Sequence, residues 1–344
     1  MSAATGTVLI PRDAHAVAKP MNARRSGDTL ALRCPLCGAP MDGVLRISQP
    51  QQDGSIRCGD CSFEMRSESG IWDALPPARK ARFQRFVQEY ESVRAAEGRG
   101  GGGRMYYAAL PYQDATGRHV FQWHIRSRSF RYFEREILRS LEHKCQRPLV
   151  VLDLGAGNGW LSYRLTLRGH SCVAVDLLVN EFDGLAAASH YAPLLPHPLT
   201  CFRAEVDRLP FADEQSDCVV FNASLHYSEN YAHTLSEALR CLRVGGTLAI
   251  VDSPWYHSEA SGAAMVAERR EDFKRRFGFP SDALASQEYL TDGRLADLQT
   301  KLGIQWTVHR PWYGLRWAAR PLIAKLNGKR EPSSFRIYTA VKTS

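Results

Sequence analysis

The hydrophobic pattern of residues 145–255 alternates between short apolar runs and stretches of helical length. The first apolar run, residues 149–154, predicts a buried strand, and residues 160–167 predict the helix that follows it. The alternation continues with expected strands at 171–175, 200–204, 218–221 and 247–251 and expected helices at 184–191 and 232–242. Strands that alternate with helices form a parallel sheet covered on both faces, so the sequence predicts an α/β fold.

The same pattern divides the whole chain into four segments. A helix is expected after Pro76 and Pro77, with Phe83, Val87, Tyr90 and Arg94 on one face, and it ends before Gly98. Two closing strands are expected at 304–309 and 335–341. The segments are a disordered tail (1–30), a small module with many turn signals (31–75), a helix with a glycine-rich linker (76–128) and the α/β domain (129–344), which opens with a helix at 129–144.

An aromatic and basic run follows the glycines at 98–103, which are too dense for a regular element. The run includes Tyr106, Tyr107, Trp123 and Arg126. Because such a run beside a flexible linker can close over a ligand and exclude water, we expect a lid here.

A glycine-rich turn follows the first buried strand. Its sequence is Gly155-Ala156-Gly157-Asn158-Gly159, and Trp160 comes next. Glycines let the backbone approach a ligand closely, and the helix that follows points its free N–H groups at the bound group, which favours a nucleotide-like cofactor. Trp160 stands where a dinucleotide-binding loop has its third glycine, which disfavours NAD. Taken alone, the loop also fits an ordinary tight turn.

Acidic residues follow the next two strands. Asp176 ends the second strand and can accept hydrogen bonds from ribose hydroxyls, although an isolated aspartate can also be a turn residue. Glu205 follows the third strand, Asn222 ends the fourth, and Gly245-Gly246 leads into the fifth. In this order, the residues from about 145 to 255 resemble the class I S-adenosylmethionine-dependent methyltransferases.

The resemblance implies a Rossmann-like sheet of seven strands in the order 3-2-1-4-5-7-6, with the last strand antiparallel. It also implies that the glycine loop holds the methionine portion, that Asp176 holds the ribose and that Glu205 holds the adenine edge. Members of the family usually have aspartate at the position of Glu205. The cofactor-binding residues expected are Asp153, Gly155, Ala156, Gly157, Asn158, Gly159, Asp176, Leu177, Glu205, Val206, Asn222 and Arg126, the last as a partner of the methionine carboxylate.

Methyl transfer from a sulfonium needs alignment more than covalent help, because the methyl group is already activated. A base is required only when the accepting atom is poorly acidic. His226 and Tyr227 follow the fourth strand, where the family faces the transferred methyl group, and they are the expected catalytic residues. The alternative is that His226 only shapes the pocket.

Four of the nine cysteines form two Cys-x-x-Cys pairs. Cys34 and Cys37 are separated by twenty residues from Cys58 and Cys61, a spacing typical of a structural zinc site. Disulfides are the rival interpretation. A zinc ribbon before such a domain is similar to the arrangement in ribosomal RNA guanine-N1 methyltransferases, but there the final ligand is usually histidine.

The chain carries 44 basic and 36 acidic residues, a net charge of +8, and part of the excess lies in residues 310–334, an expected insertion between the last two strands. Trp312, Trp317, Leu322 and Leu326 interleave with cations there. That mixture fits RNA, an anionic membrane surface, a lid, or a packed helix with solvated charges. No apolar run approaches the roughly 18 residues of a membrane span. Neither a span nor a secretory signal is predicted, and a cytoplasmic location is expected.

These features together predict an S-adenosylmethionine-dependent methyltransferase with a structural Zn²⁺ site, acting on a small-molecule or lipid-like acceptor. RNA, a ribosomal RNA base in particular, is the alternative substrate. A scaffold that binds the cofactor without catalysis is the alternative of another class. The sequence leaves the accepting atom and the oligomeric state open.

Overall fold

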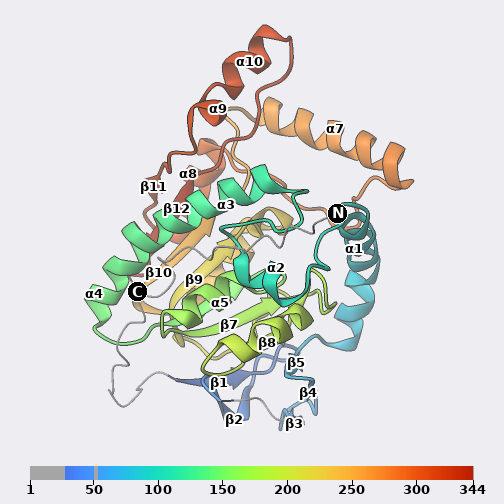
Figure 1. Cartoon of the computed structure of the whole chain (residues 1–344). Helices are drawn as coiled ribbons and strands as arrows, with labels where there is room; N and C mark the ends of the chain where they lie inside the picture. The colour runs from blue at the N-terminus through green and yellow to red at the C-terminus, as the bar shows by residue number, and fades with distance from the viewer. Residues whose placement is uncertain (1–27, 50–52, 344) are drawn as a thin grey trace, which may run out of the picture.

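The computed structural model describes residues 28–49 and 53–343 (Figure 1). Most of the tail expected at residues 1–30 therefore lies outside the described residues. Residues 29 and 30 of that expected tail belong to the first strand instead, because Leu30 is buried in the core.

Within the described residues, one mixed sheet holds ten strands in the order β11-β12-β10-β9-β6-β7-β8-β5-β4-β3. Seven of them, β8-β7-β6-β9-β10-β12-β11, follow the expected order 3-2-1-4-5-7-6, and β12 is antiparallel to β10. The expected sheet of seven strands is thus too small, because three strands of the N-terminal module join its edge. The strands are β3 (Gly54–Arg57), β4 (Glu64–Glu68), β5 (Ile71–Asp73), β6 (Val150–Leu154), β7 (Ser171–Asp176), β8 (Thr200–Arg203), β9 (Ser216–Asn222), β10 (Leu242–Val251), β11 (Thr307–His309) and β12 (Ile337–Val341).

Helices cover both faces of this sheet. They are α1 (Pro77–Ala96), α2 (Gly103–Ala109), α3 (Val120–Tyr132), a π-helical turn (Phe133–Leu138), α4 (Arg139–Cys145), α5 (Trp160–Leu167), α6 (Tyr231–Cys241), α7 (Glu259–Phe277), α8 (Asp292–Leu302), α9 (Leu315–Ala318) and α10 (Arg320–Leu326). Short 3₁₀ helices occupy Leu185–His190, Ala192–Leu194 and Leu225–Tyr227. The helix expected at 184–191 is therefore a 3₁₀ helix, and the one expected at 129–144 begins earlier, at Val120.

Alternate residues of the central strand enter two different cores. Val150 and Leu152 of β6 pack in a cluster with Leu235 of α6, whereas Val151 packs on the other face in a cluster with Leu161 of α5. Successive side chains of a strand point to opposite faces, so a strand buried on both faces must be apolar at nearly every position. This requirement explains why every residue of the run that predicted β6 is apolar except Asp153.

The N-terminal module is fused to the sheet. Strands β1 (Thr29–Arg33) and β2 (Pro40–Arg46) form a separate hairpin, but β5 pairs in parallel with β8, with Trp72 opposite Phe202. Leu32 and Met65 of the module belong to the same hydrophobic cluster as Phe202. The module and the domain therefore share one hydrophobic cluster, and a second cluster on the other face of the sheet has its buried members in the domain and the segment before it.

The aromatic residues of the expected lid are part of the core. Tyr106, Tyr107 and Trp123 are buried, and Trp123 makes an edge-to-face contact with Trp160 at a centroid distance of 6.1 Å. In this structure the three rings pack in the core, and Arg126 is the residue of the run that lines the cavity described below.

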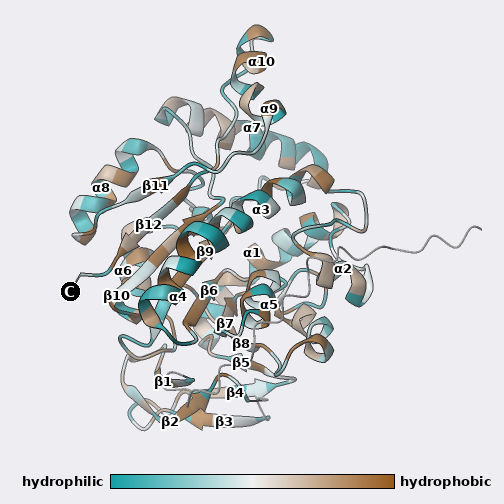
Figure 2. Ribbon diagram, turned by 60° about the vertical axis from the view of Figure 1, so that its left-hand side comes forward, coloured by the Kyte–Doolittle hydropathy of each residue, from teal (hydrophilic) through white to brown (hydrophobic). Residues whose placement is uncertain are grey.

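The insertion at 310–334 folds into α9 and α10, which project from one end of the molecule, while β1 and β2 lie at the other end (Figure 1). Figure 2 shows apolar residues on α10, away from the sheet. No helix in residues 28–49 and 53–343 combines the length and the apolar character needed to cross a membrane.

Candidate functional site

The glycine loop turns sharply between β6 and α5. Gly155, Gly157 and Gly159 have φ values of +75°, +56° and +75°, which side chains disfavour. A Cβ on Gly155 would also lie 2.3 Å from Cβ of Ser224. The loop can therefore be built only with glycine at Gly155, and the backbone stays open toward the ends of the neighbouring strands.

Asp176 holds this loop at the end of β7. Its two carboxylate oxygens accept hydrogen bonds from the backbone N–H groups of Gly157 and Leu178, both at 2.8 Å. Burial raises the pKa of Asp176 to about 6, although these N–H groups favour the ionised form. The carboxylate is thus fixed in position beside the loop.

A cavity opens at the carboxyl ends of β6, β7, β8 and β9, where the strand order of an α/β sheet reverses and ligands bind. It encloses about 1140 Å³ including its open mouth. Ten of the twelve residues expected from the sequence to bind the cofactor line it: Gly155, Ala156, Gly157, Asn158, Asp176, Leu177, Glu205, Val206, Asn222 and Arg126.

Asp153 and Gly159, the other two expected residues, are not among those that line the cavity. Asp153 is buried below the loop, where one oxygen accepts hydrogen bonds from the N–H and hydroxyl groups of Ser162 at 3.2 and 2.9 Å. Burial raises the pKa of Asp153 to about 7. Gly159 precedes α5, and its N–H donates to the carbonyl of Ala156. Both residues fix the shape of the loop.

Glu205 follows β8 and is almost completely buried. Its carboxylate accepts hydrogen bonds from the guanidinium of Arg79, through Nε at 2.9 Å and through Nη2. Arg79 lies in the first turns of α1 and also stacks over Phe83 at 5.1 Å. A bidentate pair of this kind connects α1 to the carboxyl end of β8.

Helix α1 forms one wall of the cavity, a role that the sequence analysis did not assign. Phe83, Phe86, Tyr90 and Arg94 of α1 line the cavity together with Tyr227. The rings of Phe86 and Tyr90 lie 6.0 and 5.7 Å from that of Tyr227, both edge to face. The sequence predicts that Phe83, Tyr90 and Arg94 lie on one face of a helix, but it does not show what that face contacts. The contact between this face and the cavity joins segments that are far apart in the sequence.

Arg126 is a cation enclosed at the cavity wall. No hydrogen bond or ion pair is present for its side chain among residues 28–49 and 53–343, and the guanidinium stacks over Trp123 at 5.0 Å. Burial lowers the pKa of Arg126, with Arg99 and Arg94 nearby adding to the effect. A half-buried cation without a carboxylate partner is unfavourable, so the site favours an anionic ligand group.

The two expected catalytic residues differ in their access to the cavity. Tyr227 lines it, whereas His226 does not. Burial, with Arg269, Arg126 and Arg94 nearby, lowers the pKa of His226 to about 3, so its ring is neutral. Its Nδ1 is buried with no hydrogen-bond partner in the described part of the chain. The ring contacts Tyr227 at a centroid distance of 4.3 Å, so His226 can act on the cavity through Tyr227.

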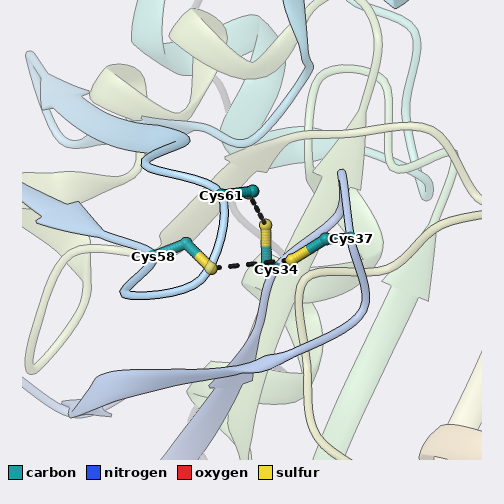
Figure 3. A group of neighbouring side chains, drawn as sticks. All are labelled: Cys34, Cys37, Cys58 and Cys61. Carbon is teal, nitrogen blue, oxygen red and sulfur yellow. Dashed lines mark hydrogen bonds between the residues drawn. The ribbon is translucent and has the colours of Figure 1, made fainter.

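The four cysteines of the N-terminal module converge on one point (Figure 3). Their sulfur atoms all lie within 4.8 Å of one another, and the pairs Cys34–Cys61 and Cys37–Cys58 are separated by 3.5 and 3.6 Å. Four thiolates around Zn²⁺, with Zn–S bonds of about 2.3 Å, would be about 3.8 Å apart. All four thiols are free, so the spacing fits a metal rather than a disulfide.

Two matching turns bring these sulfur atoms together. The N–H of Cys34 donates to the carbonyl of Ala39, and the N–H of Cys58 donates to that of Phe63. In each turn the first cysteine's carbonyl accepts from the residue four positions later. The backbone N–H of Cys61 lowers the pKa of the Cys58 thiol to about 7, while burial raises that of Cys34 to about 12. Metal binding would displace the remaining protons.

Comparison with known proteins agrees with this geometry. Residues 152–250 match the family model described as a methyltransferase domain. An uncharacterised methyltransferase of Mycobacterium tuberculosis is 37% identical over 101 residues, which cover 29% of this chain and 38% of the relative. A demethylmenaquinone methyltransferase of the same species is 28% identical over 171 residues, covering 48% and 68% of the two chains.

A solved structure, that of the Burkholderia thailandensis 1,6-didemethyltoxoflavin-N1-methyltransferase with its substrate and S-adenosylhomocysteine, aligns with 86% of this chain and 100% of that chain. Its TM-score is 0.46 and its sequence identity 16%. The chain spans only 38% of the length of the uncharacterised relative.

Proposed function

We propose that the protein transfers a methyl group from S-adenosylmethionine to a small-molecule or lipid-like acceptor. The observation that carries this proposal is the cavity at the carboxyl ends of β6–β9, in which the glycine loop, two carboxylates and an unpaired cation face one space. The match of residues 152–250 to methyltransferase domains supports it.

The charged groups of the cavity fit the parts of S-adenosylmethionine. The open backbone from Gly155 to Asn158 would receive the methionine portion, and Arg126 would pair with its carboxylate. Asp176, with Leu177, would accept the ribose hydroxyls. Glu205 and Val206 would face the adenine, with Arg79 orienting the carboxylate. In this proposal Asp153 and Gly159 act indirectly, by holding the loop.

The chain's own residues then position the acceptor and exclude water. Bound S-adenosylmethionine supplies an electrophilic methyl group. Tyr227, Phe86 and Tyr90 offer an apolar aromatic wall on which a flat acceptor could lie. His226 with a pKa of about 3 is a weak base, so we assign it the orientation of Tyr227 rather than proton abstraction.

The acceptor class follows from that wall. Apolar and aromatic lining favours a small organic molecule, and one relative is named for demethylmenaquinone, a small molecule. The cysteine cluster would hold a structural Zn²⁺ ion, because four thiolates leave no open coordination position for chemistry.

Calorimetric titration with S-adenosylmethionine tests the cofactor site. Asp176→Ala should weaken binding by about 1–3 kcal/mol, or roughly 5- to 160-fold, because two charge-assisted hydrogen bonds are lost. Asp297→Ala, at an exposed position of α8, is the matched control and should bind like the unaltered chain. Equal affinity of the two variants would refute the ribose assignment.

Release of S-adenosylhomocysteine in the presence of fractionated cell extract tests the acceptor. Product should form with the small-molecule and lipid pools. Turnover confined to the RNA pool would establish the alternative substrate. Binding of the cofactor without turnover on either pool would favour a scaffold.

A further inference from the structure

The segment Trp312–Lys329, here called the protrusion, exposes large apolar side chains at an unusual density. Leu315 is 80% exposed, Leu326 77% and Leu322 62%, and Trp312 and Ile323 are also more than half exposed. These five lie within fifteen consecutive positions. Contiguous exposed apolar surface of this kind marks an interaction site rather than ordinary solvent-facing surface.

Cations are interleaved with these side chains, and acidic residues are absent from positions 310–330. Arg316, Lys325 and Lys329 are exposed. Within residues 28–49 and 53–343, none of the three forms an ion pair. Their charge is therefore available to an anionic partner at the same place where the apolar side chains are exposed.

The base of the protrusion is fixed to the domain. Tyr313 is buried, and its hydroxyl lies 2.9 Å from Oγ of Ser129. Trp317 packs between Tyr313 and Phe335, with centroid distances of 5.1 and 5.2 Å. Anchored in this way, α9 and α10 project from one end of the molecule (Figures 1 and 2), and their leucines are exposed.

Exposed aliphatic side chains together with cations fit some classes of partner better than others. RNA is bound through phosphates and through stacking of bases on aromatic rings, whereas four of the five apolar side chains here are aliphatic. A second copy of the chain would bring two basic protrusions together, and like charges would repel. An anionic bilayer offers phosphates for the cations and hydrocarbon for the leucines.

We propose that the protrusion is a membrane-docking element that inserts Leu315, Leu322, Ile323 and Leu326 into the interface of an anionic lipid bilayer. Arg316, Lys325 and Lys329 then lie at the level of the lipid phosphates. This proposal does not depend on methyl transfer, because it concerns a surface outside the cavity. If the proposed function holds as well, docking would bring the enzyme to acceptors dissolved in the membrane.

Vesicle sedimentation with the full chain tests the proposal. The unaltered protein should sediment with vesicles of phosphatidylcholine and phosphatidylglycerol, and much less with phosphatidylcholine alone. The triple variant Leu315→Ser, Leu322→Ser, Leu326→Ser should bind the anionic vesicles at least about tenfold more weakly, since apolar burial is lost. Lys325→Gln with Lys329→Gln should weaken binding and reduce its sensitivity to salt.

The matched control replaces apolar residues exposed elsewhere, Val44→Ser on β2 and Leu194→Ser beside the sheet, and should sediment like the unaltered chain. All variants should keep the thermal transition and the S-adenosylmethionine affinity of the parent, so lost docking is distinguishable from lost folding or a failed cofactor assignment. The proposal is overturned if the parent stays in solution with anionic vesicles, or if the triple variant binds as well as the parent. It is also overturned if that variant instead loses binding to RNA or loses a dimer seen by ultracentrifugation.

Discussion

The domain carries two additions, the N-terminal module and the protrusion between β11 and β12, and the two differ in how they bury their apolar residues. At the β8 end, the N-terminal module buries Leu32, Met65 and Trp72 in a core shared with the domain. At the β11 end, the protrusion buries only its base and exposes its leucines. The first addition is therefore built into the stability of the fold, whereas the second is free to bind something else.

The difference shows that a short segment with its own sequence signature need not be an independent unit. The module has too few residues for a sufficient core, and it gains one by adding β5 to the edge strand β8. Pairing also covers an edge that would otherwise invite association with other chains. The protrusion contributes no comparable packing. Substitutions of its exposed residues should therefore change binding while changing the free energy of unfolding little.

The largest expected effect is that of Cys58→Ser. Removing one thiolate should release zinc and lower the free energy of unfolding by more than about 4 kcal/mol. Because the core is shared, we expect the whole chain to lose stability, with weaker cofactor binding, rather than the module alone. Elemental analysis and denaturant unfolding measure this. The half-buried Cys145, replaced by serine, is the control. If the domain keeps its full stability without the metal, the module is not part of the stability of the whole fold.

A pair of tryptophans compares the two additions directly. Trp72 is buried and stacks on Phe202 at 6.4 Å, whereas Trp312 is 60% exposed. Trp72→Ala should cost about 3 kcal/mol of stability through loss of buried area and a residual cavity. Trp312→Ala should change it by less than about 0.5 kcal/mol. Chemical denaturation measures both values, and similar losses would show that the protrusion is as structural as the module.

A smaller effect is expected where α1, which follows the module, meets the cavity. Arg79→Ala leaves the buried carboxylate of Glu205 without its bidentate partner, at a cost of about 2 kcal/mol of stability. Arg82→Ala breaks the more exposed pair with Glu229 and should have an effect of less than about 1 kcal/mol. Thermal unfolding of the two variants distinguishes the pairs. Equal effects would mean that α1 is not anchored through Glu205.

The smallest effect concerns the cavity between the two additions and depends on pH. Burial raises the pKa of Asp176 to about 6, and only the ionised form accepts hydrogen bonds with both oxygens. Affinity for S-adenosylmethionine should therefore be full above pH 7 and fall about tenfold by pH 5. Asp153 and Asp252 also have raised pKa values, so the quantity to measure is the difference between the parent and Asp176→Asn by calorimetry. If the affinity of both proteins for S-adenosylmethionine changes with pH in the same way, Asp176 does not contribute to cofactor binding.

The sequence could predict the residues whose positions depend on local structure, such as a strand end or a turn. The glycine loop, Asp176, Glu205 and Asn222 follow directly from strand ends, and the order of seven strands follows from the resemblance. The paired cysteines specify their cluster through two local turns. In each case a short-range rule, such as a positive φ or a fixed ligand spacing, restricts the residue type.

Only the tertiary structure decided how distant segments meet. It placed α1 on the cavity and buried Tyr106, Tyr107 and Trp123, which the sequence had suggested as a lid. It also added β3–β5 to the sheet and left the leucines of the protrusion exposed. An aromatic residue has the same local preferences in a lid, a core or an exposed surface, and its burial depends on which other segment lies opposite. The sequence by itself predicted which residues lie at the strand ends, while the fold determined what surrounds them.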